Sequence, residues 1–398
     1  MMFDATPVCP PDSVFGIAAE YRKDPNPNKI NLTVGMYQDE SGKTPVMDSV
    51  HLVECAMAKE RSSHVYLPID GHNSYNNLIG KLILGDAHSA IKENRVATMQ
   101  TPGGTGALRV AGDLLKKTYD VKTIWISNPT WGNHPQIYAA AHLDVKKYDY
   151  LDQRGTGLDF DAVLRSLSGA NAGDAVLLHT VCHNPTGVDP SAEQWDQLLT
   201  LVKEKKLLPI FDFAYQGFGS GLHEDAKPIR DFCGSGGEAL ICNSFSKNFN
   251  LYGERVGGIT AVSNSSDSAA AVLSQIKLVA RTSYSNPPTH GAEIVSRVLS
   301  DGSLRANWEN ELNLTRERID DLRTKFVDAL NQRMPAADFS HINRQRGMFS
   351  YSGISAEHVD RLKTEHSVYL LGSGRINIAG INGHNLDRLC DAIANVLG

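Results

Sequence analysis

The stretch ALICNSFSKNFNLYGERVGGITAVS, Ala239 to Ser263, decides the fold class, because a polar segment lies between two short apolar runs. The runs Ala239 to Ser244 and Gly257 to Ser263 are rich in branched residues and have the length of buried strands. Lys247 and Arg255 lie in the polar segment between them. The pattern predicts that the polar segment begins where a buried strand ends.

Three further apolar runs predict strands of the same sheet: Thr123 to Pro129, Ala175 to Val181 and Leu207 to Tyr215. Between the last two, Ser191 and Gln194 fit a capping box that opens an amphipathic helix. Strands that alternate with helices predict an α/β fold with a mostly parallel sheet covered by helices on both faces. Ligands of such sheets bind beyond the carboxyl ends of the strands.

The C-terminal part of the chain has a different pattern. From about Asn307 a long charged helical pattern leads to short strands in GMFSYSG (347–353) and GRINIAG (374–380), and then to a final helix. We expect a smaller α+β domain here, completed by the N-terminal segment. The predicted division is an arm and small-domain segment at 1–37, a large domain at 38–305 and a small domain at 306–398.

Composition excludes several classes of function. The chain has 398 residues, of which 41% are hydrophobic, and a net charge of −6, so it is no general ligand for nucleic acid or an anionic membrane. We find no apolar stretch long enough to span a bilayer, and the N-terminus lacks the features of a signal peptide. The six cysteines are scattered without a CxxC pair, which predicts reduced thiols and a cytoplasmic location.

Lys247 is the first candidate catalytic residue. An amine held beside hydroxyls, another cation and apolar strand ends loses proton affinity and becomes a nucleophile. A solvated loop lysine is the alternative interpretation. The neighbours Ser244, Ser246 and Arg255 favour the catalytic one, because hydroxyls and a guanidinium suit the oxygens of a phosphate.

A glycine-rich segment, TPGGTGALR (101–109), predicts a second part of an anion site at Gly104 and Thr105, at the start of a helix. It is not a dinucleotide fingerprint, because Arg109 takes the place of the third glycine and we see no clear strand before it. It is not a P-loop either, since no Gly-Lys-Ser/Thr follows. An ordinary helix-capping turn is the alternative interpretation.

Polar or aromatic side chains follow the other predicted strands. Asp212 lies in an apolar run three residues before Tyr215, where a carboxylate needs a hydrogen-bonding or cationic partner. It is a candidate acceptor for a protonated ring nitrogen, or else a structural cap. Trp131 follows another strand and could stack on a planar ring or be a core residue, and His134 could orient a neighbouring carboxylate.

HTVCHNPTGVDP (179–190) contains two histidines and a cysteine, but it predicts a strand and a turn, on which His179 and His183 share no face for a metal. We therefore predict no metal site and take Asn184 as a side-chain amide fixed in the cleft.

Two arginines complete the candidate site residues. Arg281 lies in VARTSYSNPP, and Arg375 lies among glycines and apolar residues, where it must be paired internally or bind a substrate carboxylate.

The sequence closely resembles the aspartate and aromatic amino acid aminotransferases of pyridoxal 5′-phosphate fold type I. The resemblance covers nearly the whole chain, and ten motifs in register make it specific: TVGMYQDESGKTP, VYLPIDG, TPGGTGALR, SNPTWGNH, CHNPTGVDP, FDFAYQGF, NSFSKNFNLYGERVGG, RTSYSNPP, GMFSYSG and GRINIAG. The resemblance implies a large domain with a mostly parallel sheet, a smaller α+β domain, and a homodimer with shared active sites.

The resemblance also implies a role for each candidate. Lys247 would bond to the cofactor aldehyde and carry the proton of the substrate α-carbon, and Asp212, supported by His134, would hold the pyridine nitrogen protonated. By the same resemblance, Trp131 would stack on the cofactor ring, and Tyr215 and Asn184 would bind its phenolic oxygen. The residues implied for its phosphate are Gly104, Thr105, Ser244, Ser246 and Arg255, with Tyr66 reaching the phosphate of the partner's cofactor.

The resemblance implies three further residues for the substrate. Arg375 would bind the α-carboxylate, and Arg281 would bind a distal carboxylate across the dimer. Gly35 would lie on a segment that closes over the substrate.

The predicted reaction moves an amino group between aromatic amino acids (Phe, Tyr, Trp) or aspartate and 2-oxoglutarate. We favour the aromatic branch because Gln38 stands where aspartate-selective relatives tend to have a basic residue and Val65 where they tend to have a polar one, and because Met36 is bulky and apolar. An aspartate aminotransferase with minor aromatic activity is the alternative. Three other interpretations are less favoured: a nicotinamide-dependent dehydrogenase, a non-enzymatic regulator on the same fold, and a β-lyase or decarboxylase. Arg281 argues against a β-lyase or decarboxylase, because it predicts a dicarboxylate substrate that neither reaction needs.

Overall fold

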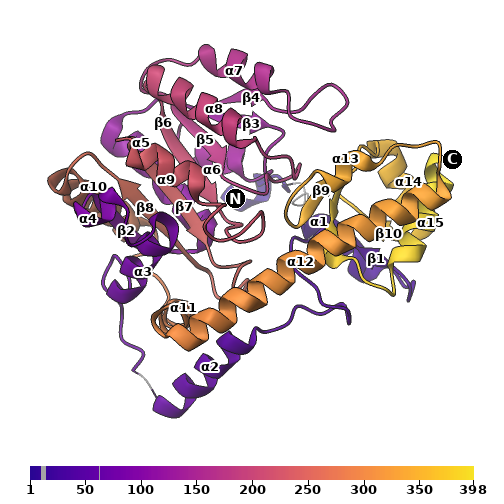
Figure 1. The fold of residues 1–398 in the computed structure, drawn as a ribbon, viewed down its shortest axis with the longest axis horizontal. Coiled ribbons are helices and arrows are strands. Elements are labelled where there is room, and N and C mark those ends of the chain that lie inside the picture. Colours follow the sequence, from indigo (N-terminus) through magenta and orange to yellow (C-terminus); the bar gives the residue numbers. More distant parts are fainter. Residues whose placement is uncertain (10–14, 62) are drawn as a thin grey trace.

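A seven-stranded sheet forms the centre of the larger part of the molecule (Figure 1). The computed structural model describes residues 1–9, 15–61 and 63–398. The strand order across the sheet is β2-β8-β7-β6-β5-β3-β4. In chain order the strands are β2 (Val96–Pro102), β3 (Thr123–Asn128), β4 (Asp144–Asp149), β5 (Ala175–His179), β6 (Leu208–Phe213), β7 (Ala239–Ser244) and β8 (Val256–Val262).

Five neighbouring strands, from β4 to β7, run parallel, and β8 is antiparallel to both β7 and β2. The carboxyl ends of β2, β3, β5, β6 and β7 therefore meet at one edge of the sheet, where β8 begins. The strand register places the site residues opposite one another at this edge: His179 pairs with Asp212, and Gly257 pairs with both Ser244 and Thr101. This edge gathers the polar segments that follow the strands.

Helices cover both faces of the sheet, because successive strand residues point to opposite sides. Ala175 and Leu177 belong to one buried cluster with α5, α6 and α10, whereas Val176 and Leu178 belong to another with α3, α8 and α9. The helices of this part are α2 (Asp48–Glu60), α3 (Asn73–Leu84), α4 (Ser89–Lys92), α5 (Gly103–Tyr119), α6 (His134–Ala140), α7 (Phe160–Ser168), α8 (Ala192–Glu204), α9 (Lys227–Gly234), α10 (Ser266–Ser283) and α11 (His290–Ser300).

The long helix α12 (Gly302–Arg333) connects the two parts of the molecule (Figure 1). Its first turns lie against α2 and α11, and its later turns lie against α13 (Ser340–Asn343) and α15 (Leu386–Leu397). Two small sheets complete the smaller part: β1 (Ile30–Asn31) with β10 (Val368–Tyr369), and β9 (Phe349–Tyr351) with β11 (Arg375–Asn377). The other elements of this part and of the N-terminus are α1 (Phe15–Lys23), α14 (Ala356–His366) and the 3₁₀ turns Met2–Ala5 and Ile378–Gly380.

The predicted α/β fold with a mostly parallel sheet is confirmed, and each of the five apolar runs is a strand. The predicted capping box at Ser191 is present, with Gln194 N–H donating to the Ser191 hydroxyl. The predicted division at residue 305 falls within α12, which passes from the larger to the smaller part without a break. The division into three segments therefore stays a prediction.

Two strands of the seven-stranded sheet, β2 and β4, were not predicted from the sequence, and one stated absence is wrong. A strand, β2, does lead into Gly103, although the segment Val96 to Pro102 alternates apolar residues with threonine and glutamine. It is held by pairing along its whole length with β8, which no local pattern reveals. The edge strand β4 was missed because its sequence, DVKKYD, is mostly charged. In the described part of the chain, no helix is long and apolar enough to cross a membrane.

Candidate active site

Lys247 lies just beyond the carboxyl end of β7, partly buried, with its amine 5.3 Å from the centre of the Tyr215 ring. Burial, together with the charges of Arg255 and Arg375, lowers the pKa of this amine to about 8 against the opposing effect of Asp212. A lysine with such a pKa is substantially neutral near pH 8. It can therefore act as a nucleophile and as a proton carrier.

Asp212, near the carboxyl end of β6, has the partner that its buried position requires. Its Oδ2 atom lies 3.0 Å from Nε2 of His134, whose ring is completely buried at the start of α6. Burial raises the pKa of Asp212, but the His134 hydrogen bond and the nearby charges outweigh burial and hold the pKa below its usual range. The site therefore contains an ionised carboxylate, able to accept a hydrogen bond from a protonated heterocycle.

A chain of hydrogen bonds continues from His134 to the next strand end. The Thr130 hydroxyl lies 2.8 Å from Nδ1 of His134 and 3.0 Å from Nε2 of His179, and the Asn184 N–H donates to Nδ1 of His179 over 3.4 Å. Burial lowers the pKa of His179 to about 3, so its ring is neutral. With His179 neutral, all these bonds are satisfied if His134 donates Nε2–H to Asp212.

The predicted anion-binding residues lie together where α5 begins. The Ser244 and Ser246 hydroxyls are 3.1 Å apart, and Arg255 donates to Ser246 over 3.5 Å. The two glycines before Thr105 lie against these side chains. A Cβ atom at Gly103 would come within 2.7 Å of Nη2 of Arg255, and a Cβ atom at Gly104 would come within 3.2 Å of Cβ of Ser244. Thr105 is in the same first turn of α5. A helix N-terminus, two hydroxyls and a guanidinium form a site suited to a phosphate.

Arg375, on β11, connects the smaller part of the molecule to this edge of the sheet. Its buried guanidinium donates through Nη1 to Oδ1 of Asn184 over 3.1 Å and through Nη2 to the carbonyl of Thr33. Its Nε–H has no partner among the described residues. Burial lowers the pKa of Arg375 to about 10, which still leaves it charged at neutral pH. The side chain is therefore paired internally and keeps a free donor, and its binding of a substrate carboxylate stays a prediction.

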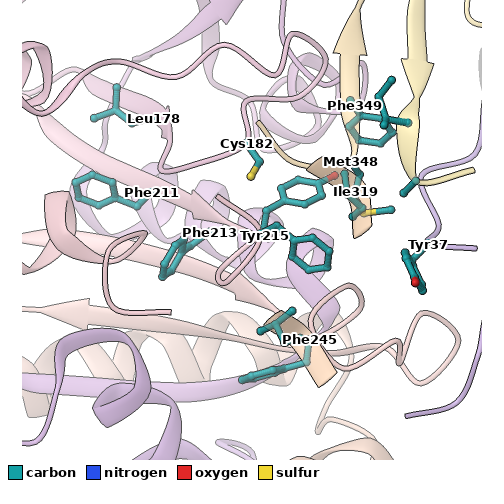
Figure 2. Close-up of a cluster of buried hydrophobic side chains, with 14 of the residues drawn as sticks. Tyr37, Leu178, Cys182, Phe211, Phe213, Tyr215, Phe245, Ile319, Met348 and Phe349 are labelled. Atoms are coloured by element: carbon teal, nitrogen blue, oxygen red, sulfur yellow. The ribbon is translucent and has the colours of Figure 1, made fainter. Parts of the chain in front are cut away.

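Phe349, which the sequence analysis did not single out, lies at the centre of this group. The Arg375 guanidinium is 4.0 Å from its ring centre, and the Tyr215 ring is 6.2 Å away, edge on. Figure 2 shows Tyr215 and Phe349 in one cluster of buried side chains with Cys182. A Cβ atom at Gly35 would come within 2.5 Å of the Phe349 ring, so the segment around Gly35 passes directly against it.

Three candidates lie apart from this group or at its margin. Trp131 is partly exposed, with its ring perpendicular to that of His134 and 5.1 Å from it. Tyr66 is 90% exposed, and the exposed Arg281 donates to Ser285. In the described part of the chain, no hydrogen bond links Tyr66 or Arg281 to the Lys247 group.

Sequence reasoning missed Thr130 and the part that His179 has in the hydrogen-bond chain. Their position just after β3 and at the end of β5 was the available signal, since both strands were predicted. The described residues contain no group of three His, Cys, Asp or Glu side chains that could hold a metal ion. The tilted rings of His179 and His183 have centres 4.1 Å apart.

Comparisons with known proteins agree with this arrangement. The family model described as aminotransferase class I and II matches residues 27–393. The chain is 47% identical to the aspartate aminotransferase of Escherichia coli K12 over 396 residues, and 41% identical to the tyrosine aminotransferase of Klebsiella pneumoniae over 397 residues, with all of each chain covered.

Solved structures show the same similarity. The aromatic-amino-acid aminotransferase of Burkholderia pseudomallei, whose structure contains covalently bound pyridoxal phosphate, superimposes with a TM-score of 0.97 at 43% identity, and each chain is covered completely. The cytoplasmic aspartate aminotransferase of Saccharomyces cerevisiae gives a TM-score of 0.97 at 35% identity, with 100% of this chain and 98% of that chain covered. This chain therefore belongs to the class I and II aminotransferase family.

Proposed function

We propose that the protein is a pyridoxal 5′-phosphate-dependent transaminase that moves an amino group between an aromatic amino acid or aspartate and 2-oxoglutarate. Family membership and relatives with both substrate preferences support this reaction class. The observation that carries the proposal is the position of Lys247, an amine with a pKa of about 8 between an ionised Asp212 and a phosphate-type site.

The residues present fit this cofactor. A neutral amine at Lys247 suits its aldehyde, the Asp212 carboxylate suits its ring nitrogen, and the hydroxyl of Tyr215 and the amide of Asn184 suit its phenolic oxygen. The phosphate would be held by the residues at the start of α5 and after β7, namely Gly104, Thr105, Ser244, Ser246 and Arg255. When bound, the cofactor supplies a reactive aldehyde and a protonated ring that accepts electrons.

The protein's own residues then have separate tasks. Lys247 takes the proton from the substrate α-carbon and returns it during the transfer, for which a pKa near the working pH is suited. Asp212 stays ionised because His134 donates to it, so it holds a proton on the ring nitrogen in place. Trp131 lies beside His134 and would cover one face of the ring.

Substrate binding requires a cation for the carboxylate at the α-carbon. Arg375 is the proposed residue, because its guanidinium is held by Asn184 and Thr33 and stacks on Phe349, which fixes its orientation. Gly35 lies on the segment that would cover the substrate, and its contact with the Phe349 ring links that segment to Arg375. Arg281 is the proposed residue for the second carboxylate of aspartate, glutamate or 2-oxoglutarate.

A homodimer is part of the proposal, since Tyr66 and Arg281 would act in the partner's site. Their exposure supports this, and so do the apolar residues next to them, because Val65 is 70% exposed and Leu278 is 61% exposed. Burial in a dimer interface would remove these side chains from water. Cytoplasmic location also remains a proposal, supported by the six cysteines, all of which are free thiols in the described structure.

We further propose that aromatic amino acids are preferred over aspartate, since Met36 and Val65 make the predicted mouth of the site apolar. The test is a comparison of kcat/KM for phenylalanine, tyrosine, aspartate and glutamate with purified protein. We expect all four to be substrates, with the two aromatic ones at least equal to aspartate. A kcat/KM for both aromatic substrates far below that for aspartate would instead support an aspartate aminotransferase.

A further inference from the structure

Two carboxylates with little exposure to solvent, Asp189 and Asp225, have no role in the proposed reaction. Asp225 is buried and Asp189 is partly buried, and in the described part of the chain neither has a Lys, Arg or His partner within salt-bridge distance. An isolated carboxylate in such a position costs free energy unless hydrogen bonds offset the loss of water. In both cases the hydrogen bonds come from backbone N–H groups.

Asp189 binds the turn that carries Asn184. Its Oδ2 atom accepts the N–H of Cys182 over 2.7 Å, and its Oδ1 atom accepts the N–H of His183 over 2.8 Å. Cys182 has a left-handed backbone, with φ of +55°, which a non-glycine residue adopts only at a cost. Asn184 is the next residue after this pair, and its amide oxygen accepts the hydrogen bond from Arg375.

Asp225 binds the turn that follows Tyr215 in the same way. Its Oδ2 atom accepts the N–H groups of Gly217 and Gly219 over 2.8 and 3.0 Å, and its Oδ1 atom accepts that of Ser220 over 2.7 Å. Gly217 has a left-handed φ of +95°. The carboxylate therefore determines the path of the chain two residues after Tyr215.

The two turns follow adjacent parallel strands and touch each other. Strands β5 and β6 pair with His179 opposite Asp212, so the turns leave the same edge of the sheet side by side. A Cβ atom at Gly219 would come within 2.4 Å of the Val181 side chain and 2.6 Å of Oδ1 of Asp225. Gly219 therefore packs directly against Val181 and Asp225, so the two turns are in contact while each is held by its own carboxylate.

We propose that Asp189 and Asp225 are positioning residues that together fix the distance between the Asn184 amide and the Tyr215 hydroxyl. This inference rests on the proposed function, in which these two groups bind one oxygen of the cofactor. A hydrogen bond to a negatively charged oxygen stabilises its ionised form. Displacing either donor therefore raises the pH at which the bound cofactor loses its proton, and the cofactor's visible absorbance reports that change without any turnover.

The test measures the midpoint of the visible-absorbance pH titration of the bound cofactor in wild type, Asp189→Asn and Asp225→Asn. An asparagine offers one carbonyl oxygen in place of two carboxylate oxygens, so at least one backbone N–H at each turn loses its acceptor. We expect each variant to raise the midpoint by about 0.5 to 1 pH unit, the size of one weakened hydrogen bond. Asp159→Asn, which changes a helix-capping carboxylate at α7, is the matched control and should leave the midpoint unchanged.

Crossed double variants separate positioning from a general loss of structure. We expect the effect of Asp189→Asn to disappear in an Asn184→Ala background and to persist in a Tyr215→Phe background, and the reverse for Asp225→Asn. Equal effects in both backgrounds, or no shift in either variant, would overturn the inference. If the asparagine variants do not fold by circular dichroism, Asp189→Ser and Asp225→Ser, which leave room for water, give the same readout.

Failure of the proposed function would look different. In that case wild-type protein mixed with pyridoxal 5′-phosphate would show no visible band that titrates with pH, whatever residue stands at 189 or 225. A wild-type band that titrates normally, together with unshifted variants, contradicts only the positioning role.

Discussion

Nε2 of His134, at the start of α6, lies 3.0 Å from Oδ2 of Asp212, near the end of β6, although the two residues are 78 positions apart. The His134 ring is held from its other side by the Thr130 hydroxyl, which lies within hydrogen-bonding distance of His179 as well. This arrangement keeps a buried carboxylate ionised without a permanently charged partner. The first prediction concerns that carboxylate.

Replacing Asp212 by asparagine should lower kcat at least about 100-fold, because an amide cannot hold a proton on a ring nitrogen by its charge. Steady-state kinetics with phenylalanine and 2-oxoglutarate measures the change. Thr130→Val is the graded control, since it removes the hydroxyl that contacts His134 and His179 but leaves the hydrogen bond between His134 and Asp212, and it should cost about 10-fold or less. Near-normal kcat for Asp212→Asn would show that Asp212 has a structural role only.

The reactivity of Lys247 should depend on pH with a midpoint near 8. Its pKa is lowered in the folded protein, so the neutral amine forms as pH rises through about 8 rather than near the usual 10.5. Competitive labelling of the cofactor-free protein with an amine-reactive reagent, followed by peptide mass spectrometry, measures the rate at Lys247 against exposed lysines. Arg255→Met removes one of the cations that lower the pKa, so its midpoint should lie higher. A wild-type midpoint close to 10.5 contradicts the account.

Arg281 should decide between dicarboxylic and aromatic substrates. In Arg281→Ala, we expect kcat/KM for aspartate and glutamate to fall about 100-fold or more, because a charge-assisted pair with the distal carboxylate is lost. The value for phenylalanine should change less than about 5-fold, since its ring needs no cation. Half-reaction kinetics with each amino acid measures these changes, and Arg281→Lys shows whether charge alone is sufficient. A parallel loss for phenylalanine would exclude this role.

Gly35 should tolerate no side chain while Phe349 is present. In Gly35→Ala the new methyl group meets the Phe349 ring within 2.5 Å, and that ring stacks on Arg375. We expect KM for every amino acid substrate to rise about 10-fold, because overpacking displaces the guanidinium. Phe349→Leu in the same chain creates room and should recover part of the loss. If the double variant is worse than both single variants combined, the steric explanation is wrong.

The sequence was sufficient for the strands that carry the site, since β5, β6, β7 and β8 are short, apolar and followed by polar turns. It was not sufficient for β2, whose alternating threonines and glutamine become a strand only through pairing with β8. The position of Gly103 and Gly104 after a strand was therefore missed, although the anion-binding character of the turn was predicted. Tertiary pairing, which has no local signal, accounts for this difference.

The candidate residues were predicted by type and position, but their contacts were not. The hydrogen bond from Arg375 to Asn184 joins residues 191 positions apart, and the stacking of Arg375 on Phe349 depends on how β9 and β11 pair. The positioning carboxylates Asp189 and Asp225 were invisible in the sequence, because an aspartate after a turn is ordinarily exposed. Their importance follows only from their burial and from the backbone N–H groups that face them.

Every role proposed for the site depends on one covalent bond, between the amine of Lys247 and pyridoxal 5′-phosphate. Sodium borohydride reduces and so fixes such a carbon–nitrogen bond, and mass spectrometry of the digested protein then locates the added mass. We predict one labelled peptide, with the label on Lys247, and no label in Lys247→Arg protein treated identically. A label on another lysine, or none in the wild-type protein, would contradict the account.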